Sequence, residues 1–83
     1  MQIVYDAAQA AMQSIVDDIN AGKFAKLAGT VAAISEDRRG IEVTSDGYTA
    51  GVGLTFIAYN SVDEVVTELA SRLVFWINDD VAK

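Results

Sequence analysis

The stretch IEVTSDGYTAGVGLTFIAY, residues 41–59, decides the fold, because it contains two extended runs joined at Asp46-Gly47. Asp-Gly between alternating runs is the strongest short-range signal for a β-hairpin, since both central residues of a type I′ turn need a positive φ. A two-residue loop sets three cross-strand pairs on one sheet face: Ser45–Tyr48, Val43–Ala50 and Ile41–Val52. This apolar face continues through Leu54 and Phe56, and the rest of the chain is expected to cover it.

The second strand of the hairpin is predicted to run from Tyr48 to Tyr59, about 40 Å if fully extended. That length exceeds what a small domain usually needs. Gly51 and Gly53 are natural places for a bulge or a bend. We therefore expect a kinked strand, or one whose end reaches a neighbouring subunit.

A further strand is expected before the hairpin, over Thr30–Glu36, followed by a turn at residues 37–40 in which Gly40 adopts a positive φ. The preferred register sets three pairs: Glu36–Ile41, Ile34–Val43 and Ala32–Ser45. A slip of one residue would instead place Val31 and Ala33 on the apolar face.

Two helices flank the predicted strands. The first is expected at roughly residues 6–21, with Asp6 as N-cap and Gly22 as left-handed C-cap, while Met1–Tyr5 reads either as an extension of this helix or as a brief strand. The second begins at Ser61, where Ser61 and Glu64 form a capping box. Its apolar stripe consists of Val62, Val65, Val66, Leu69, Leu73, Trp76 and Ile77.

These elements predict one α+β domain over residues 1–83, with the order α-β-β-β-α. The sheet is a three-stranded antiparallel meander, and both helices pack on its apolar face. The chain has no cysteine, so no disulfide stabilises this small domain. Because 52% of the residues are apolar, which is above the usual share, the composition indicates burial between subunits.

The C-terminal helix carries the clearest sign of such burial. Phe75 falls on its polar side, so the segment Leu73, Val74, Phe75, Trp76 and Ile77 is apolar around the whole helix. A helix segment of this kind is usually buried on all sides, and a two-layer domain has little chain left to cover it. We expect Trp76 in the core and Phe75 in a contact with a second copy, since two-fold dimers are the commonest oligomers.

The net charge of −6 argues against direct nucleic-acid binding, which needs clustered Lys and Arg, and against an anionic membrane surface. No apolar run approaches the ~18 residues of a membrane span. Residues 1–20 contain no Lys or Arg, unlike the start of a secretory signal. A soluble, cytoplasmic protein is the expectation.

Between Gly40 and Ser71 there is no basic residue, and five acids occur in this span: Glu42, Asp46, Asp63, Glu64 and Glu68. Such acids can simply keep a protein soluble. If they share one surface, they form a candidate patch for a basic partner, because charge complementarity speeds and selects binding.

The residue types argue against an enzyme and against a bound cofactor or metal. Histidine and cysteine are both absent, so the usual general base at neutral pH and the commonest zinc ligands are missing. The adjacent acids Asp17-Asp18 and Asp79-Asp80 diverge by about 100° around a helix and do not converge on one ion.

Two functional hypotheses follow. The first is a non-catalytic protein-protein interaction module that forms a homodimer through Leu73–Ile77. The alternative is an acidic inhibitor or nucleic-acid mimic that occupies a basic groove of a nucleic-acid-handling protein, for which a viral or mobile-element origin would be natural.

Overall fold

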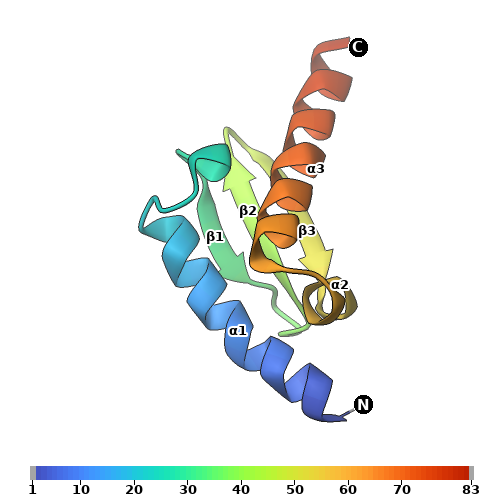
Figure 1. The fold of residues 1–83 in the computed structure, drawn as a ribbon. Helices are drawn as coiled ribbons and strands as arrows, with labels where there is room; N and C mark the ends of the chain where they lie inside the picture. Colours follow the sequence, from blue (N-terminus) through green and yellow to red (C-terminus); the bar gives the residue numbers. More distant parts are fainter. Residues whose placement is uncertain (1, 83) are drawn as a thin grey trace.

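The structure, a computed structural model, describes the backbone of residues 2–82 and the side chains of residues 7–78. Figure 1 shows one sheet with two long helices, one near each of its two edge strands. The elements are α1 (Gln2–Asn20), the 3-10 helix η1 (Ala25–Leu27), β1 (Val31–Ile34), β2 (Gly40–Ser45), β3 (Tyr48–Gly53), α2 (Leu54–Tyr59) and α3 (Val62–Ala82). The strands are antiparallel in the order β1-β2-β3. The predicted α+β class and α-β-β-β-α order are confirmed, with α2 as an additional helix.

The β2–β3 hairpin has the predicted turn and register. Asp46 and Gly47 have φ values of 52° and 84°, as a type I′ turn requires. Ser45 pairs with Tyr48, and the ladder continues to the pair Gly40–Gly53. Local turn chemistry is sufficient to determine this part of the sheet.

The register between β1 and β2 differs by two residues from the preferred prediction, since Ile34 pairs with Ile41 and Ala32 with Val43. The loop comprises residues 36–39, and Ser35 N–H donates to the Gly40 C=O at 2.9 Å. The predicted positive φ at Gly40 is wrong, because Arg38 adopts it instead, at 61°. A two-residue shift leaves the same side chains on the same face. Ala32 is therefore still buried and Ile34 still packs against the core.

The predicted long strand to Tyr59 is also wrong. β3 ends at Gly53, and residues 54–59 form α2, which buries Ile57. The physical reason lies in β2, which begins at Gly40 opposite Gly53, so the chain beyond Gly53 has no strand to pair with. Its backbone groups are satisfied by a helical turn instead. The Leu54 N–H closes the junction by donating to the Arg39 C=O at 2.6 Å.

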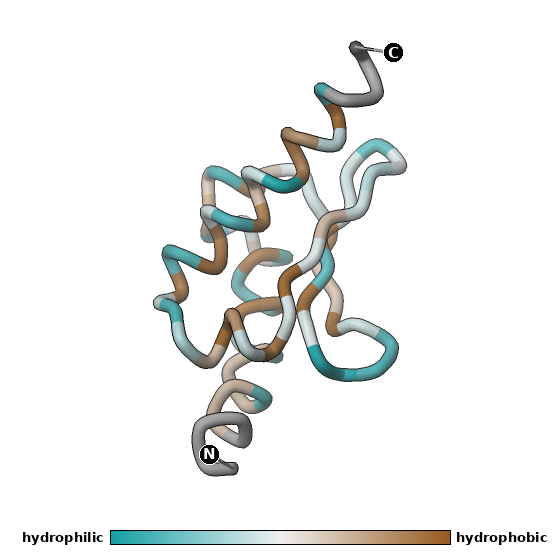
Figure 2. The backbone as a smooth tube through the Cα atoms, turned by 90° about the vertical axis from the view of Figure 1, so that its right-hand side faces the viewer, coloured by the Kyte–Doolittle hydropathy of each residue, from teal (hydrophilic) through white to brown (hydrophobic). Residues whose placement is uncertain are grey.

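Both long helices cover the same face of the sheet, as predicted. α1 contacts β1, and α3 contacts β3 and β2. The inner face consists of buried side chains: Ala32, Ile41, Val43, Ala50 and Val52. The outer face carries exposed ones, among them Val31, Ala33, Glu42, Thr44 and Thr49. Figure 2 shows the helices on one side of the strands and no element over the other side.

Of the two alternatives left open for the N-terminal residues, an extension of the first helix and not a strand is the one found from Gln2 onward. Helix α1 already includes Gln2, so Asp6 is not the N-cap; no Gly or Pro in this stretch stops the helix, and Met1 lies outside the described residues. Its C-terminus is as predicted, with Gly22 at φ 78°. The Lys23 N–H donates to the Asp18 C=O and the Gly22 N–H to the Ile19 C=O, which is the Schellman arrangement.

Helix α3 begins with the predicted capping box. The Glu64 N–H donates to Ser61 Oγ at 3.1 Å, and the Ser61 N–H donates to Glu64 Oε1 at 2.8 Å. After this start, the helix places four side chains in the core: Val65, Val66, Leu69 and Leu73. Figure 1 shows that its last turns extend beyond the end of the sheet.

Candidate interaction surface

The far end of α3 exposes a group of large apolar side chains, which we call the α3 apolar surface: Val74, Phe75 and Trp76. They are 54%, 64% and 50% exposed, whereas the preceding Leu73 is only 6% exposed. The predicted self-association segment is thus divided, because Leu73 lies in the core and Ile77 packs partly against it. The prediction that Trp76 lies in the core is wrong, since half of this side chain is exposed.

The two aromatic rings of this surface contact each other. Phe75 and Trp76 have ring centroids 5.7 Å apart and planes inclined by 76°, an edge-to-face pair. Such pairs are favourable by about 0.5–1.5 kcal/mol beyond the area they bury. The contact therefore joins the two rings into one apolar surface that a partner could cover.

A groove of about 460 Å³ separates this surface from the sheet, lined by Thr49, Ala50, Gly51, Ser71, Arg72, Phe75 and Trp76. Arg72, one of the lining residues, donates from Nη1 to the Gly51 C=O at 2.6 Å and from Nε to Glu68 Oε2 at 3.1 Å. Its guanidinium also lies 6.0 Å from the centre of the Phe56 ring. The i,i+4 spacing of Glu68 and Arg72 signals their ion pair in the sequence, but nothing in the sequence signals the contact with Gly51.

The two edges of the sheet differ in how they are covered. At the β1 edge, the Asn20 side chain accepts from the Ala32 N–H at 2.8 Å and donates to the Ala32 C=O at 3.0 Å, so its amide replaces a neighbouring strand. At the β3 edge, Ser45 and Tyr48 are the pair that closes the hairpin. Because bonded and non-bonded pairs alternate along an antiparallel ladder, the N–H and C=O groups of Thr49 and Gly51 point away from β2. Arg72 covers the Gly51 C=O, whereas the Thr49 N–H and C=O face the groove side of the strand.

Three residues of the predicted acidic patch are close together. Asp63, Glu64 and Glu68 line a second hollow of about 380 Å³ beside Phe56 and Asn60. The Ser61 N–H and then the Ser61 hydroxyl hold the pKa of Glu64 below its ordinary value. Two of the three carboxylates therefore already have partners within the chain, since Glu64 caps α3 and Glu68 binds Arg72.

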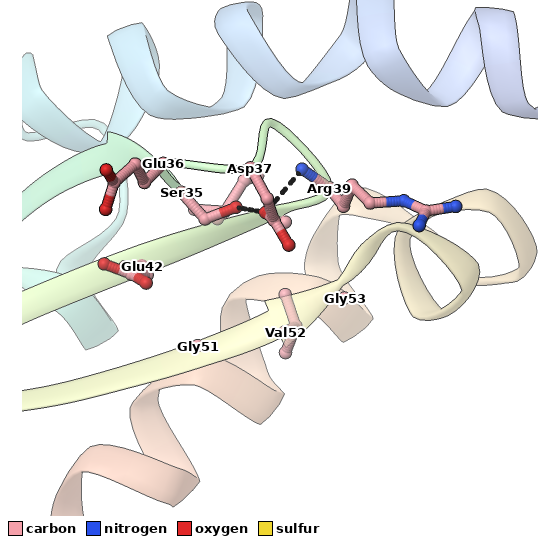
Figure 3. A pocket seen from close by; sticks show the side chains of 10 residues that line it. Ser35, Glu36, Asp37, Arg39, Glu42, Gly51, Val52 and Gly53 are labelled. Atoms are coloured by element: carbon pink, nitrogen blue, oxygen red, sulfur yellow. Dashed lines mark hydrogen bonds between the residues drawn. The ribbon is translucent and has the colours of Figure 1, made fainter.

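The other two predicted acids lie elsewhere. Asp46 is in the β2–β3 turn, at the opposite end of β3 from α2. Glu42 is on the outer face of the sheet, in the hollow of about 470 Å³ that Figure 3 shows. In that hollow Asp37 accepts hydrogen bonds from Ser35 Oγ at 2.7 Å and from the Arg39 N–H at 3.0 Å, and both, the Ser35 bond foremost, lower the pKa of Asp37.

Residues 7–78 contain no group of three or more potential metal-ligating side chains. In the described part of the chain, no helix combines the length and the apolar character needed to cross a bilayer. The α3 apolar surface adjoins the β3 edge, because residues of both line the same groove.

No protein-family model, curated protein or solved structure matches the chain.

Proposed function

We propose that this chain is a non-catalytic, cytoplasmic protein-interaction module that self-associates through the α3 apolar surface. The observation that supports it is the exposure of Val74, Phe75 and Trp76 as neighbours on one helix. Single exposed apolar residues are normal, but Phe75 and Trp76 contact each other and so form a joined apolar surface of the kind that marks an interaction site.

A second copy is the partner that these residues favour. Trp and Phe are enriched at the cores of interfaces, where charged residues are depleted. The α3 apolar surface matches this composition, and an identical surface on another copy is apolar in the same way. A two-fold axis brings such surfaces together and closes the assembly as a dimer.

Sedimentation velocity over a range of protein concentrations tests the proposal. We expect the wild type to sediment as a dimer at high concentration and the variant Phe75→Asp as a monomer, because a carboxylate buried in an apolar interface is strongly unfavourable. Val62→Asp is the matched control: Val62 is also an exposed apolar residue of α3, at 44%, but it lies in the first turn, where an acid suits the helix dipole. It should leave the dimer intact. A wild type that remains monomeric at millimolar concentration would contradict the proposal.

The acidic-inhibitor hypothesis remains a second candidate, favoured by the grouping of Asp63, Glu64 and Glu68 along one hollow. Its test is competition with double-stranded DNA for a basic DNA-binding protein at increasing salt. Asp63→Asn should weaken that competition, because Asp63 extends the acidic surface without serving in the capping box. Competition that is unchanged by the substitution and by salt would reject this candidate.

A further inference from the structure

The α3 apolar surface is smaller than the area that each partner buries in a standard dimer interface. Aromatic side chains carry about 150–250 Å² of surface, so the exposed parts of Val74, Phe75 and Trp76 amount to roughly 300 Å² per copy. A standard interface buries about 800 Å² per partner. If the proposed self-association is correct, the interface must include surface next to these residues.

The adjoining surface is the β3 edge, because Thr49 and Gly51 line the same groove as Phe75 and Trp76. An edge strand with outward N–H and C=O groups is a template for another strand. The β1 edge does not offer this template at Ala32, whose N–H and C=O are both bonded to Asn20. The two edges therefore differ, and the open one lies beside the exposed aromatic residues.

We infer that two copies join β3 to β3 in antiparallel fashion around Thr49, forming one continuous six-stranded sheet. The Thr49 N–H of each copy donates to the Thr49 C=O of the other. This register follows from Arg72, which binds the Gly51 C=O: pairing centred on Thr49 uses Thr49 alone for the two central hydrogen bonds and leaves the Gly51 C=O to Arg72. The inference rests on the proposed function, and it specifies the surface that completes the interface.

The geometry of antiparallel pairing brings the helices together as well. A two-fold axis between antiparallel edge strands runs perpendicular to the sheet, so the helix-bearing faces of both copies lie on the same side. Because α3 packs over β3, the two α3 helices flank the axis. Their apolar surfaces then meet across it, and this explains why the exposed side chains lie beside the open edge.

Amide hydrogen exchange of the wild type, measured by NMR at concentrations below and above self-association, tests the inference directly. When nine-tenths of the chains are paired, exchange of the Thr49 amide should slow about tenfold, because it proceeds through the unpaired tenth. The Ala32 amide is the internal control, since Asn20 binds it within one chain, and its rate should not depend on concentration.

A matched pair of variants gives an independent test. Thr49→Pro removes the outward N–H, which an edge strand tolerates, whereas Thr49→Val keeps it; both lose the contact between the Thr44 and Thr49 hydroxyls. Loss of two reciprocal hydrogen bonds should raise the dimer Kd roughly 5- to 150-fold for Thr49→Pro. For Thr49→Val the change should stay within about twofold. Circular dichroism checks folding, and if Thr49→Pro does not fold, the exchange of the wild type decides.

The outcomes separate the two proposals. A wild type that dimerises without slowing of Thr49 exchange, or with equal Kd values for the two variants, would overturn β3 pairing and leave the proposed self-association through α3 intact. A wild type that stays monomeric would overturn both.

Discussion

Gly40 lies where the backbone of β3 leaves no room for a side chain. A Cβ atom at this position would overlap the carbonyl oxygen of Val52 on the facing strand. Its role is thus to permit close approach of two backbones, not to adopt a positive φ. Asn20 shows a different residue-scale role, because one side-chain amide at the end of α1 satisfies both backbone groups of Ala32.

Substitution of Gly40 by alanine should therefore be costly. We expect Gly40→Ala to lower the free energy of unfolding by about 2–3 kcal/mol, since neither facing backbone can move without disturbing the ladder. Gly53→Ala is the control, because a Cβ there meets no atom within 4 Å and its φ of −85° suits alanine; it should change the value by less than about 1 kcal/mol. Urea unfolding measures both. If both substitutions lowered the free energy of unfolding equally, the overlap with the Val52 carbonyl oxygen would not be the cause of the loss.

At the scale of single elements, α3 combines two different segments. Its first turns are held by the capping box and by the buried side chains Val65 and Leu69. Further along, Val74, Phe75 and Trp76 present apolar side chains to solvent, and Figure 1 shows the end of the helix extending beyond the sheet. An isolated helix end gains little stability from propensity alone, so a contact with another copy would also stabilise these last turns.

The capping box predicts a loss of stability in acid. The Ser61 N–H holds the pKa of Glu64 below its ordinary value in the folded chain. The ionised Glu64 therefore stabilises the folded chain at pH values above the pKa of this group in the unfolded chain, about 4.3. This stabilisation is lost as the pH falls through the lower pKa that Glu64 has in the folded chain. Glu64→Gln keeps an oxygen that can accept from Ser61 but does not titrate. In urea unfolding at about pH 7 and pH 3, this variant should lose less stability in acid than the wild type. An equal loss would contradict the role of the Glu64 charge.

At the scale of the whole molecule, the protein is a two-layer domain with one sheet face open and one helix longer than the sheet it covers. The principal-axis extents of 43 × 24 × 22 Å reflect this elongated shape. Both proposals depend on this arrangement, since α3 presents the aromatic pair beside the β3 edge.

Trp76 provides a direct spectroscopic report of assembly, because it is the only tryptophan in the chain. Self-association through the α3 apolar surface should bury its half-exposed ring and shift its fluorescence to shorter wavelength as the concentration rises. The Phe75→Asp variant should show no such shift. If the wild type dimerised by sedimentation without any change in emission, the interface would exclude Trp76.

The amino-acid sequence by itself determined the features that form within a few residues of chain. These are the Asp46-Gly47 turn with its register, the Gly22 C-cap, the Ser61–Glu64 capping box and the apolar patterns that predict α+β. Each depends on hydrogen bonds or periodicity that close locally, so neighbouring residues contain the information. The acidic positions were also evident, but not their distribution over three separate parts of the surface.

Only the tertiary structure decided where β3 ends, which register β1 adopts and which side chains of α3 remain exposed. The extent of β3 depends on where β2 begins, and the exposure of Trp76 depends on which distant segments pack against α3. The contacts of Asn20 with Ala32 and of Arg72 with Gly51 join residues 12 and 21 positions apart. Such interactions form only when distant segments meet in space, so no local pattern could specify them.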